Sequence, residues 1–191
     1  MKDVKSMFPE AEIKNEELFI WVEKCLLVVP EYFWTLPAST SGKYHLEDNM
    51  EGGLVRHTRK SLVSAKELRY VFNFDDSEMD VIYSAIILHD TFRCGVDGQE
   101  KKKDGKLCSD RLHPLYPRNG LRKIDPSETI KKEVNLIFKI IEGHMGIWSP
   151  IFRLYPMSLK REPIDRSDMM IIFVHICDMV ASRESIKVEL K

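Results

Sequence analysis

The stretch SAIILHDTFRCG, residues 84–95, is an apolar run that ends in a histidine and an aspartate, His89 and Asp90. The longer segment VIYSAIILHD is apolar on nearly every side, which is typical of a helix at the centre of a protein core. An imidazole and a carboxylate are costly to bury without partners, and both are common metal ligands. The stretch therefore predicts a central helix that ends in a functional pair, provided that the rest of the chain supplies matching ligands.

Helical periodicity dominates the remaining sequence. Apolar residues recur at helical spacing after Asn15, after the Gly52-Gly53 pair, and again over 128–141 and 169–180. We expect N-caps at Asn15, at Ser77 with Asp80 completing a variant capping box, at Asp125, and at Ser167. The expected apolar stripe of the last helix is Met169, Ile172, Phe173, Ile176 and Val180.

No segment alternates in the manner of a strand, and residues 93–111 are polar with three glycines, which favours a solvated loop. The predicted fold class is all-α, a single-domain helical bundle of about six helices. Residues 1–49 should form an N-terminal helix and loop packed on the core, and residues 50–191 the main domain.

Composition limits the function classes. The chain has 191 residues, of which 43% are hydrophobic and 31% charged, and its formal net charge of -1 creates no global field that would attract nucleic acid. Its four cysteines form no CxxC pair and favour free thiols in a reducing compartment. The N-terminus has no apolar signal segment, and Glu23 and Lys24 interrupt LFIWVEKCLLVV. We therefore expect a cytoplasmic protein that does not enter the membrane.

The candidate metal ligands are distributed one or two per helix, mostly inside or at the end of apolar segments. They are His57, His89, Asp90, His113, His144 and Asp178. Helices of a bundle that project such side chains inward can form a common metal site, and a carboxylate such as Asp90 can bridge two ions. Asp178 is embedded in IIFVHICDMV with no lysine or arginine one turn before it, so it needs another partner.

The ordered motifs GGLVRHT, LHD, HP, EGH and CDMVASR, spread over roughly residues 50–185, resemble those of the HD-domain metal-dependent phosphohydrolase superfamily. The resemblance implies an HD-type helical domain over 50–191. It assigns His57, His89, Asp90 and Asp178 to one metal, and His113 and His144 to a second. The implied cofactors are one or two divalent transition metals, chosen among Mn, Fe, Co, Ni and Zn.

Within the superfamily, KYHLEDNMEGGLVRHT and GHMGIWSP look most similar to the HD domain of bacterial 3′–5′ exoribonucleases. Those enzymes carry a separate OB domain, for which we expect no room in this sequence. The family often follows HD with a small residue, Gly and Lys, whereas HDTFRCG has Arg93 at the place of the lysine. Arg93 can still bind phosphate, and does so bidentately, but the substrate of those enzymes does not transfer.

Several further residues are candidates for contact with a substrate. We assign Asp90 and Arg93 to catalysis, and the cations expected to bind substrate are Arg93, Lys106, Arg111 and Arg118. The aromatic residues Trp148, Phe152 and Tyr155 either stack on a base or belong to the core. We expect His45 at the surface or at a pocket, His175 in the core or beside the ligands, and Cys94 and Cys108 as incidental thiols.

The leading functional hypothesis is a phosphohydrolase that cleaves a phosphoester bond in a nucleotide, or in another phosphorylated small molecule, through a metal-activated hydroxide. One alternative is a 3′–5′ exonuclease on single-stranded nucleic acid. Another is an HD-type mixed-valent di-iron oxygenase, which uses the same ligand types. A third is a non-catalytic nucleotide-binding module. Many members of the superfamily form dimers, so the resemblance leaves a homodimer open.

Overall fold

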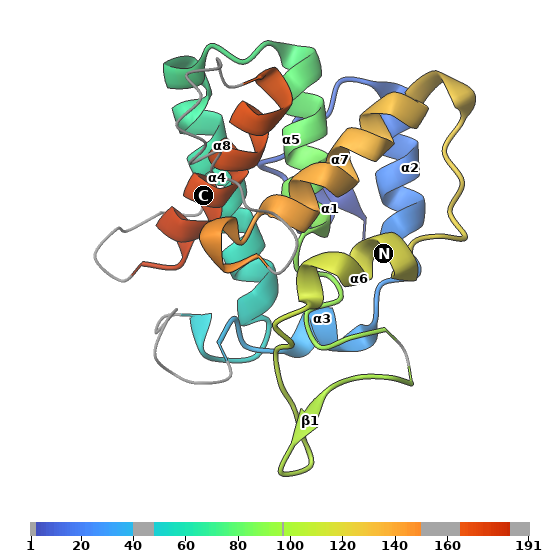
Figure 1. Ribbon diagram of the computed structural model, residues 1–191, viewed down its shortest axis with the longest axis vertical. Coiled ribbons are helices and arrows are strands. Elements are labelled where there is room, and N and C mark those ends of the chain that lie inside the picture. The colour runs from blue at the N-terminus through green and yellow to red at the C-terminus, as the bar shows by residue number, and fades with distance from the viewer. Residues whose placement is uncertain (1–2, 40–47, 97, 150–164, 184–191) are drawn as a thin grey trace.

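The computed structural model in Figure 1 describes residues 3–39, 48–96, 98–149 and 165–183 and confirms the all-α fold class. The α-helices are α1 Val4–Met7, α2 Glu16–Leu26, α3 Glu31–Thr35, α4 Gly53–Phe72, α5 Asp76–Leu88, α6 Tyr116–Gly120, α7 Lys131–Gly143 and α8 Arg166–Ala181. The described residues also include the 3₁₀ turns η2 His113–Leu115, η3 Glu128–Ile130 and η4 Gly146–Trp148 and the short strands β1 Lys102–Lys103 and β2 Lys106–Leu107. None of the described helices combines the length and the apolar composition needed to cross a bilayer.

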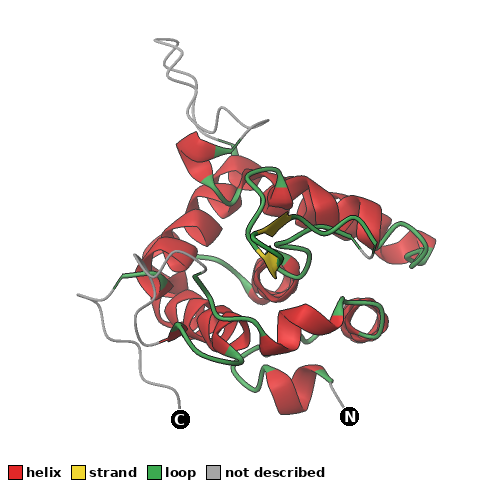
Figure 2. Cartoon of the chain, turned by 90° about the horizontal axis from the view of Figure 1, so that it is seen from below, coloured by secondary structure: helices red, strands yellow, loops and turns green. Residues whose placement is uncertain are grey.

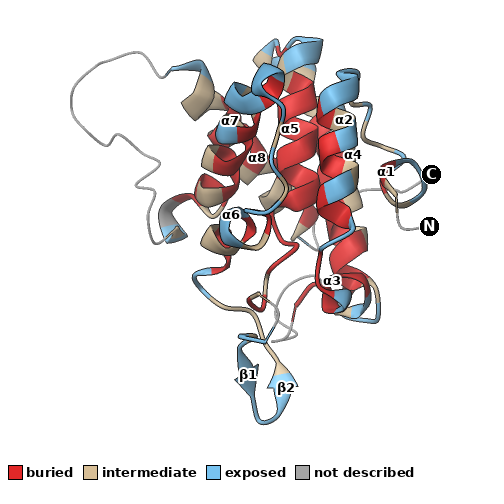
Figure 3. Cartoon of the chain, turned by 90° about the vertical axis from the view of Figure 1, so that its right-hand side faces the viewer, coloured by how far each residue is buried: buried red, intermediate tan, exposed pale blue. Residues whose placement is uncertain are grey.

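Four long helices form the centre of the molecule. Helix α4 packs against α5 and α8, and α7 also packs against α5 and α8, so each of the four contacts at least two of the others. Figure 2, seen from below, shows that helices make up most of the described chain. Every residue of α5 from Met79 to Leu88 is buried, which Figure 3 shows as an almost continuous buried face. The prediction that VIYSAIIL forms a central helix is confirmed.

The N-terminal helices extend the same hydrophobic core, because α2 packs on α5 and α3 packs on α4. Asn15 caps α2 as predicted, and its side chain accepts a hydrogen bond from the Leu18 amide. Asp80 on α5 is buried, and its two carboxylate oxygens accept the backbone N–H groups of Lys14 and Asn15, each at 2.8 Å. The start of α2 is thereby fastened to the central helix.

Three predicted N-caps are wrong. Helix α5 has a capping box, but Asp75 and Glu78 form it, and not Ser77 and Asp80. The Asp80 carboxylate instead accepts the backbone N–H groups at the start of α2. Asp165 rather than Ser167 caps α8 and accepts from the Asp168 amide. In both cases an aspartate two residues earlier takes the cap, and the serine hydroxyl donates to it.

The third wrong cap is Asp125. The chain after Pro126 first forms the 3₁₀ turn η3, and α7 begins only at Lys131.

The stripe expected for α8 is displaced. Its buried residues are Met170, Ile171, Phe173, Val174, Cys177 and Ala181. Four of the five predicted residues are only half-buried, and Phe173 alone is buried. Because α8 packs against both α4 and α7, it buries a wide arc centred between two neighbours and not one narrow stripe.

The polar segment 93–111 contains a hairpin where only a loop was expected. Strands β1 and β2 pair antiparallel around Asp104 and Gly105, whose φ values are 51° and 75°. An Asp-Gly pair with both residues in the left-handed region is the favoured two-residue hairpin turn. The hairpin projects away from the bundle and its strand residues are largely exposed (Figure 3).

Replacing Asp80 by asparagine should destabilise the protein by about 2 kcal/mol or more, because one of the two backbone amides loses its charged acceptor in a buried place. The measurement is the free energy of unfolding in urea. Asp76→Asn is the matched control, since Asp76 lies one turn earlier on α5 with half of its side chain exposed. Equal losses in the two variants would contradict the anchoring role of Asp80.

Candidate metal centre

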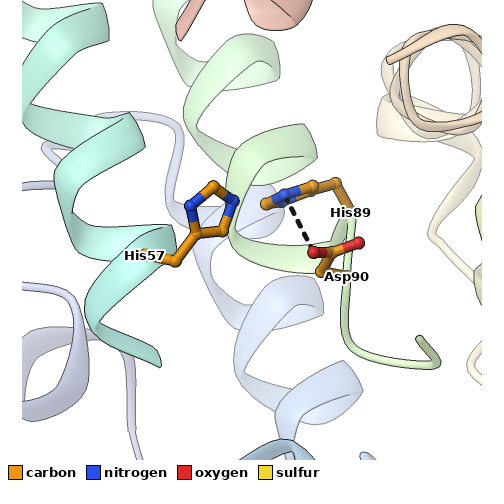
Figure 4. Close-up of side chains that lie close together, drawn as sticks. All are labelled: His57, His89 and Asp90. Carbon is orange, nitrogen blue, oxygen red and sulfur yellow. Dashed lines mark ion pairs between the residues drawn. The ribbon is translucent and has the colours of Figure 1, made fainter. Parts of the chain in front are cut away.

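The structure brings together all six predicted ligands. His57 comes from α4, His89 and Asp90 from the end of α5, His113 from η2, His144 from the end of α7, and Asp178 from α8. Figure 4 shows His57 of α4 facing the His89–Asp90 pair. Possible ligand atoms of His57, His89 and Asp90 lie within 4.8 Å of one another, and so do those of Asp90, His113 and His144. The two groups share Asp90.

Contacts of Nδ1 with backbone carbonyls orient three of the histidines, two of them at helix ends. His89 and His144 are the C-caps of α5 and α7, and their Nδ1 atoms lie 2.6 and 2.7 Å from the carbonyl oxygens of Ile86 and Ile141. The last carbonyls of a helix have no partner within the helix, so an imidazole at the C-cap can satisfy one of them. His113 Nδ1 makes the same kind of contact, at 2.7 Å, with the carbonyl of Asp110.

These contacts decide where the imidazole hydrogens lie. A carbonyl oxygen only accepts, so each Nδ1 carries the hydrogen, and Nε2 of the neutral ring presents a lone pair. Yet His113 Nε2 lies 3.2 Å from His144 Nε2. Two lone pairs that face each other at this distance repel unless a cation joins them. Fixing Nδ1 on a carbonyl while Nε2 points inward is the usual arrangement of a metal-binding histidine.

Asp90 lies between the two groups of imidazoles. Its Oδ1 is 3.1 Å from His113 Nε2 and 3.8 Å from His144 Nε2. Its Oδ2 is 3.6 Å from His89 Nε2, a buried nitrogen that has no hydrogen-bond partner in the described part of the chain. The two carboxylate oxygens therefore face different sets of nitrogens, as a bridging ligand requires.

Asp178 has the partner that its sequence context demanded. Its Oδ1 lies 2.8 Å from His57 Nε2 and 3.8 Å from His89 Nε2. The partner comes from α4, the helix against which α8 packs, and not from a neighbouring turn of α8.

Burial and charge set the protonation states. Burial lowers the pKa of His89, against the pull of Asp90 and Asp178. Burial, together with His89 and His113, lowers the pKa of His144 to about 3. Burial alone would raise the pKa of Asp90, but the Arg93 guanidinium, the first of the groups that oppose it, holds that pKa well below the usual value. Neutral imidazoles beside ionised carboxylates are the states that bind a divalent cation.

The predicted substrate contacts are only partly brought to the site. Arg93 donates from Nη1 to Asp90 Oδ2 at 2.7 Å and from Nε to Ser109 Oγ at 2.8 Å. Arg93 and Arg111 line a pocket of about 410 Å³ beside the histidines. Lys106 lies in the exposed hairpin, and Arg118 pairs with Glu142 at 2.5 Å; neither lines this pocket. The prediction that these two residues bind substrate is not supported by their positions.

The pocket has a second wall that the sequence analysis largely missed. One side is α8, where His175, Met179 and Ser182 share a face with Asp178, and the other is Met145 with Trp148. His175, Met179 and Ser182 stand at i, i+4 and i+7, the spacing of one helix face, so the sequence could have predicted that they line the same side of the pocket. The Trp148 side chain belongs to this wall and is 49% exposed, which argues against the core alternative. His45, Phe152 and Tyr155 lie outside the described residues.

No protein-family model, curated protein or solved structure matched this chain.

The glycine pair before His57 explains how α4 can begin so close to the site. Gly52 adopts φ +69°, and a Cβ on Gly53 would lie 1.7 Å from the Asp48 carbonyl oxygen and 2.8 Å from the Ala38 nitrogen. Both are backbone atoms, and the Ala38 amide donates a hydrogen bond to the Asp48 carbonyl. Neither atom can therefore move aside as a flexible side chain could. Only glycine at position 53 lets α4 start here, one turn before His57.

Gly53→Ala should therefore lower the free energy of unfolding by about 3 kcal/mol or more, because the overpacked backbone must move. Gly52→Asn is the neighbouring control, since asparagine tolerates the left-handed conformation and its Cβ would lie 3.4 Å from the end of the Arg56 side chain and 3.7 Å from the Trp34 carbonyl oxygen, without a clash. Chemical denaturation of both variants checks the expectation. A Gly53→Ala protein as stable as Gly52→Asn would show that α4 is not confined by this contact.

Proposed function

We propose that the protein is a metal-dependent phosphohydrolase of the HD-domain superfamily, which cleaves a phosphoester bond in a nucleotide. The observation that carries the proposal is the 3.2 Å separation of His113 Nε2 and His144 Nε2, whose hydrogens are held on Nδ1 by backbone carbonyls. Such a pair, buried beside an ionised Asp90, is explained by a bound cation.

The donor set fits two ions. His57, His89, Asp90 and Asp178 would hold one, and Asp90, His113 and His144 the other. Imidazole nitrogen and carboxylate oxygen suit Mn, Fe, Co, Ni and Zn alike. When bound, a pair of such ions supplies a hydroxide at neutral pH and neutralises charge on a phosphoryl group.

The chain's own residues would orient the substrate. Arg93 holds Asp90 Oδ2 with Nη1, which fixes the bridging carboxylate. Its Nη2 has no hydrogen-bond partner among the described residues, and the side chain lines the pocket, so Nη2 is available for a phosphoryl oxygen. Arg111 lines the same pocket and adds positive charge. The pocket's volume of about 410 Å³ lies within the range of small-molecule sites, which favours a single nucleotide over a long strand.

The di-iron oxygenase remains the second candidate, because the same donor set fits iron as well as manganese. It is distinguished by its reaction: the iron-loaded protein would consume oxygen, and no phosphate, pyrophosphate or triphosphate would be released from nucleotides.

Metal-loaded wild-type protein should hydrolyse at least one member of a panel of nucleoside mono-, tri- and cyclic phosphates, with chromatography identifying the product. Asp90→Asn should reduce that activity below detection, because the shared ligand loses its charge and one of its two oxygens. Asp76→Asn, an exposed substitution at the other end of α5, should leave the activity unchanged.

Full activity in Asp90→Asn would refute the assigned mechanism. Absence of hydrolysis across the panel with every divalent ion tried would refute the phosphohydrolase itself.

A further inference from the structure

His175 lines the pocket but does not belong to the set of proposed ligands. It lies on α8 one turn before Asp178, and its Nδ1 is 2.7 Å from the carbonyl oxygen of His144. The carbonyl only accepts, so Nδ1 carries the hydrogen, and Nε2 of the neutral ring is a hydrogen-bond acceptor. The described residues offer Nε2 no hydrogen-bond donor.

The turn after α7 is shaped around this imidazole. Gly146 adopts φ +59°, and a Cβ there would lie 2.7 Å from His175 Nε2. Because Gly146 has no side chain, η4 can lie close to the His175 ring without a Cβ that would block Nε2. Trp148, at the end of η4, then lies with its ring centroid 6.0 Å from that of His175. Trp21 and Trp34 are buried in the core, whereas Trp148 is half-exposed at the pocket wall.

His175 contacts both of the other groups at this wall of the pocket: its Nδ1 binds the backbone carbonyl of His144, and its ring centroid lies 6.0 Å from that of Trp148, so it joins the histidine cluster on one side to the indole on the other. A nucleotide has phosphate, sugar and base in the same order. The 2′-hydroxyl is the sugar hydroxyl nearest the base, and it can donate a hydrogen bond to an imidazole nitrogen.

We propose that His175 Nε2 accepts a hydrogen bond from the ribose 2′-hydroxyl of a nucleotide whose base packs on Trp148. His175 is then a specificity-determining residue that selects ribonucleotides over 2′-deoxyribonucleotides. This assignment rests on the proposed function, since it takes the phosphate end of the ligand to lie at the histidine cluster.

Two substitutions separate this role from a structural one. His175→Asn places an amide nitrogen where Nδ1 lies, so it keeps the bond to the His144 carbonyl, but it has no atom at the position of Nε2. His175→Gln reaches further and can present an amide oxygen near the position of Nε2. If His175 only supported His144, asparagine would be the milder change and the preference for ribose would not depend on either variant.

The experiment uses the full chain loaded with Mn²⁺, and AMP, GMP and CMP with their 2′-deoxy counterparts. We expect wild-type protein to prefer the ribonucleotide by about tenfold in kcat/KM, mainly through KM, as for one lost hydrogen bond. In His175→Asn the preference should fall to about twofold or less, and in His175→Gln it should be restored at least in part. Quenching of tryptophan fluorescence measures binding of the same nucleotides without turnover.

Equal use of both sugars by the wild type, or an unchanged preference in His175→Asn, would overturn the assignment. Binding that prefers ribose and depends on His175, without any hydrolysis, would refute the phosphohydrolase and leave the assignment standing. Hydrolysis without a preference for ribose would support the phosphohydrolase and overturn the assignment of His175. A protein that neither binds nor hydrolyses these nucleotides would overturn both.

Discussion

One buried carboxylate, that of Asp90, lies at the centre of the site and is shared by both groups of candidate ligands. It is 3% exposed, and the charged group that keeps it ionised is the Arg93 guanidinium, which donates to one of its oxygens. Removing a carboxylate from water without such partners would cost several kcal/mol. Histidines reach this point from four elements, α4, α5, α7 and η2, which the hydrophobic core holds together. A core of similar size without Asp90 would need none of these residues.

The ends of the helices, more than their faces, build the site. His89 and His144 close α5 and α7, and their Nδ1 atoms donate to the carbonyls of Ile86 and Ile141 in the last turn of each helix. One contact thus does two things: it terminates a helix and it turns Nε2 toward Asp90. The same logic extends to His175, which binds the carbonyl of His144 and fastens α8 to the end of α7. Ligand orientation and helix packing are consequences of the same hydrogen bonds.

Much of this could be predicted from the sequence. The apolar residues before His89 predicted the buried α5, and the succession of histidines and aspartates at helix ends or in apolar segments predicted the six residues that converge. Their residue types and placement carry that information.

The helix caps were harder to predict, because Ser77 and Ser167 each follow an aspartate by two residues, and propensity alone does not decide which side chain reaches the amide. The buried arc of α8 depends on having two neighbours, which periodicity does not reveal. Positions of long side chains such as Arg118 depend on tertiary partners, here Glu142.

The most direct test of the central claim is an anomalous-difference map from crystals of the wild-type protein grown with Mn²⁺. The account predicts two peaks, one among His57, His89 and Asp178 and the other beside His113 and His144, both in contact with the Asp90 carboxylate. A single peak in contact with Asp90 would reduce the centre to one ion. Maps with no peak among these residues, for manganese and equally for iron and zinc, would contradict the metal centre and the function proposed from it.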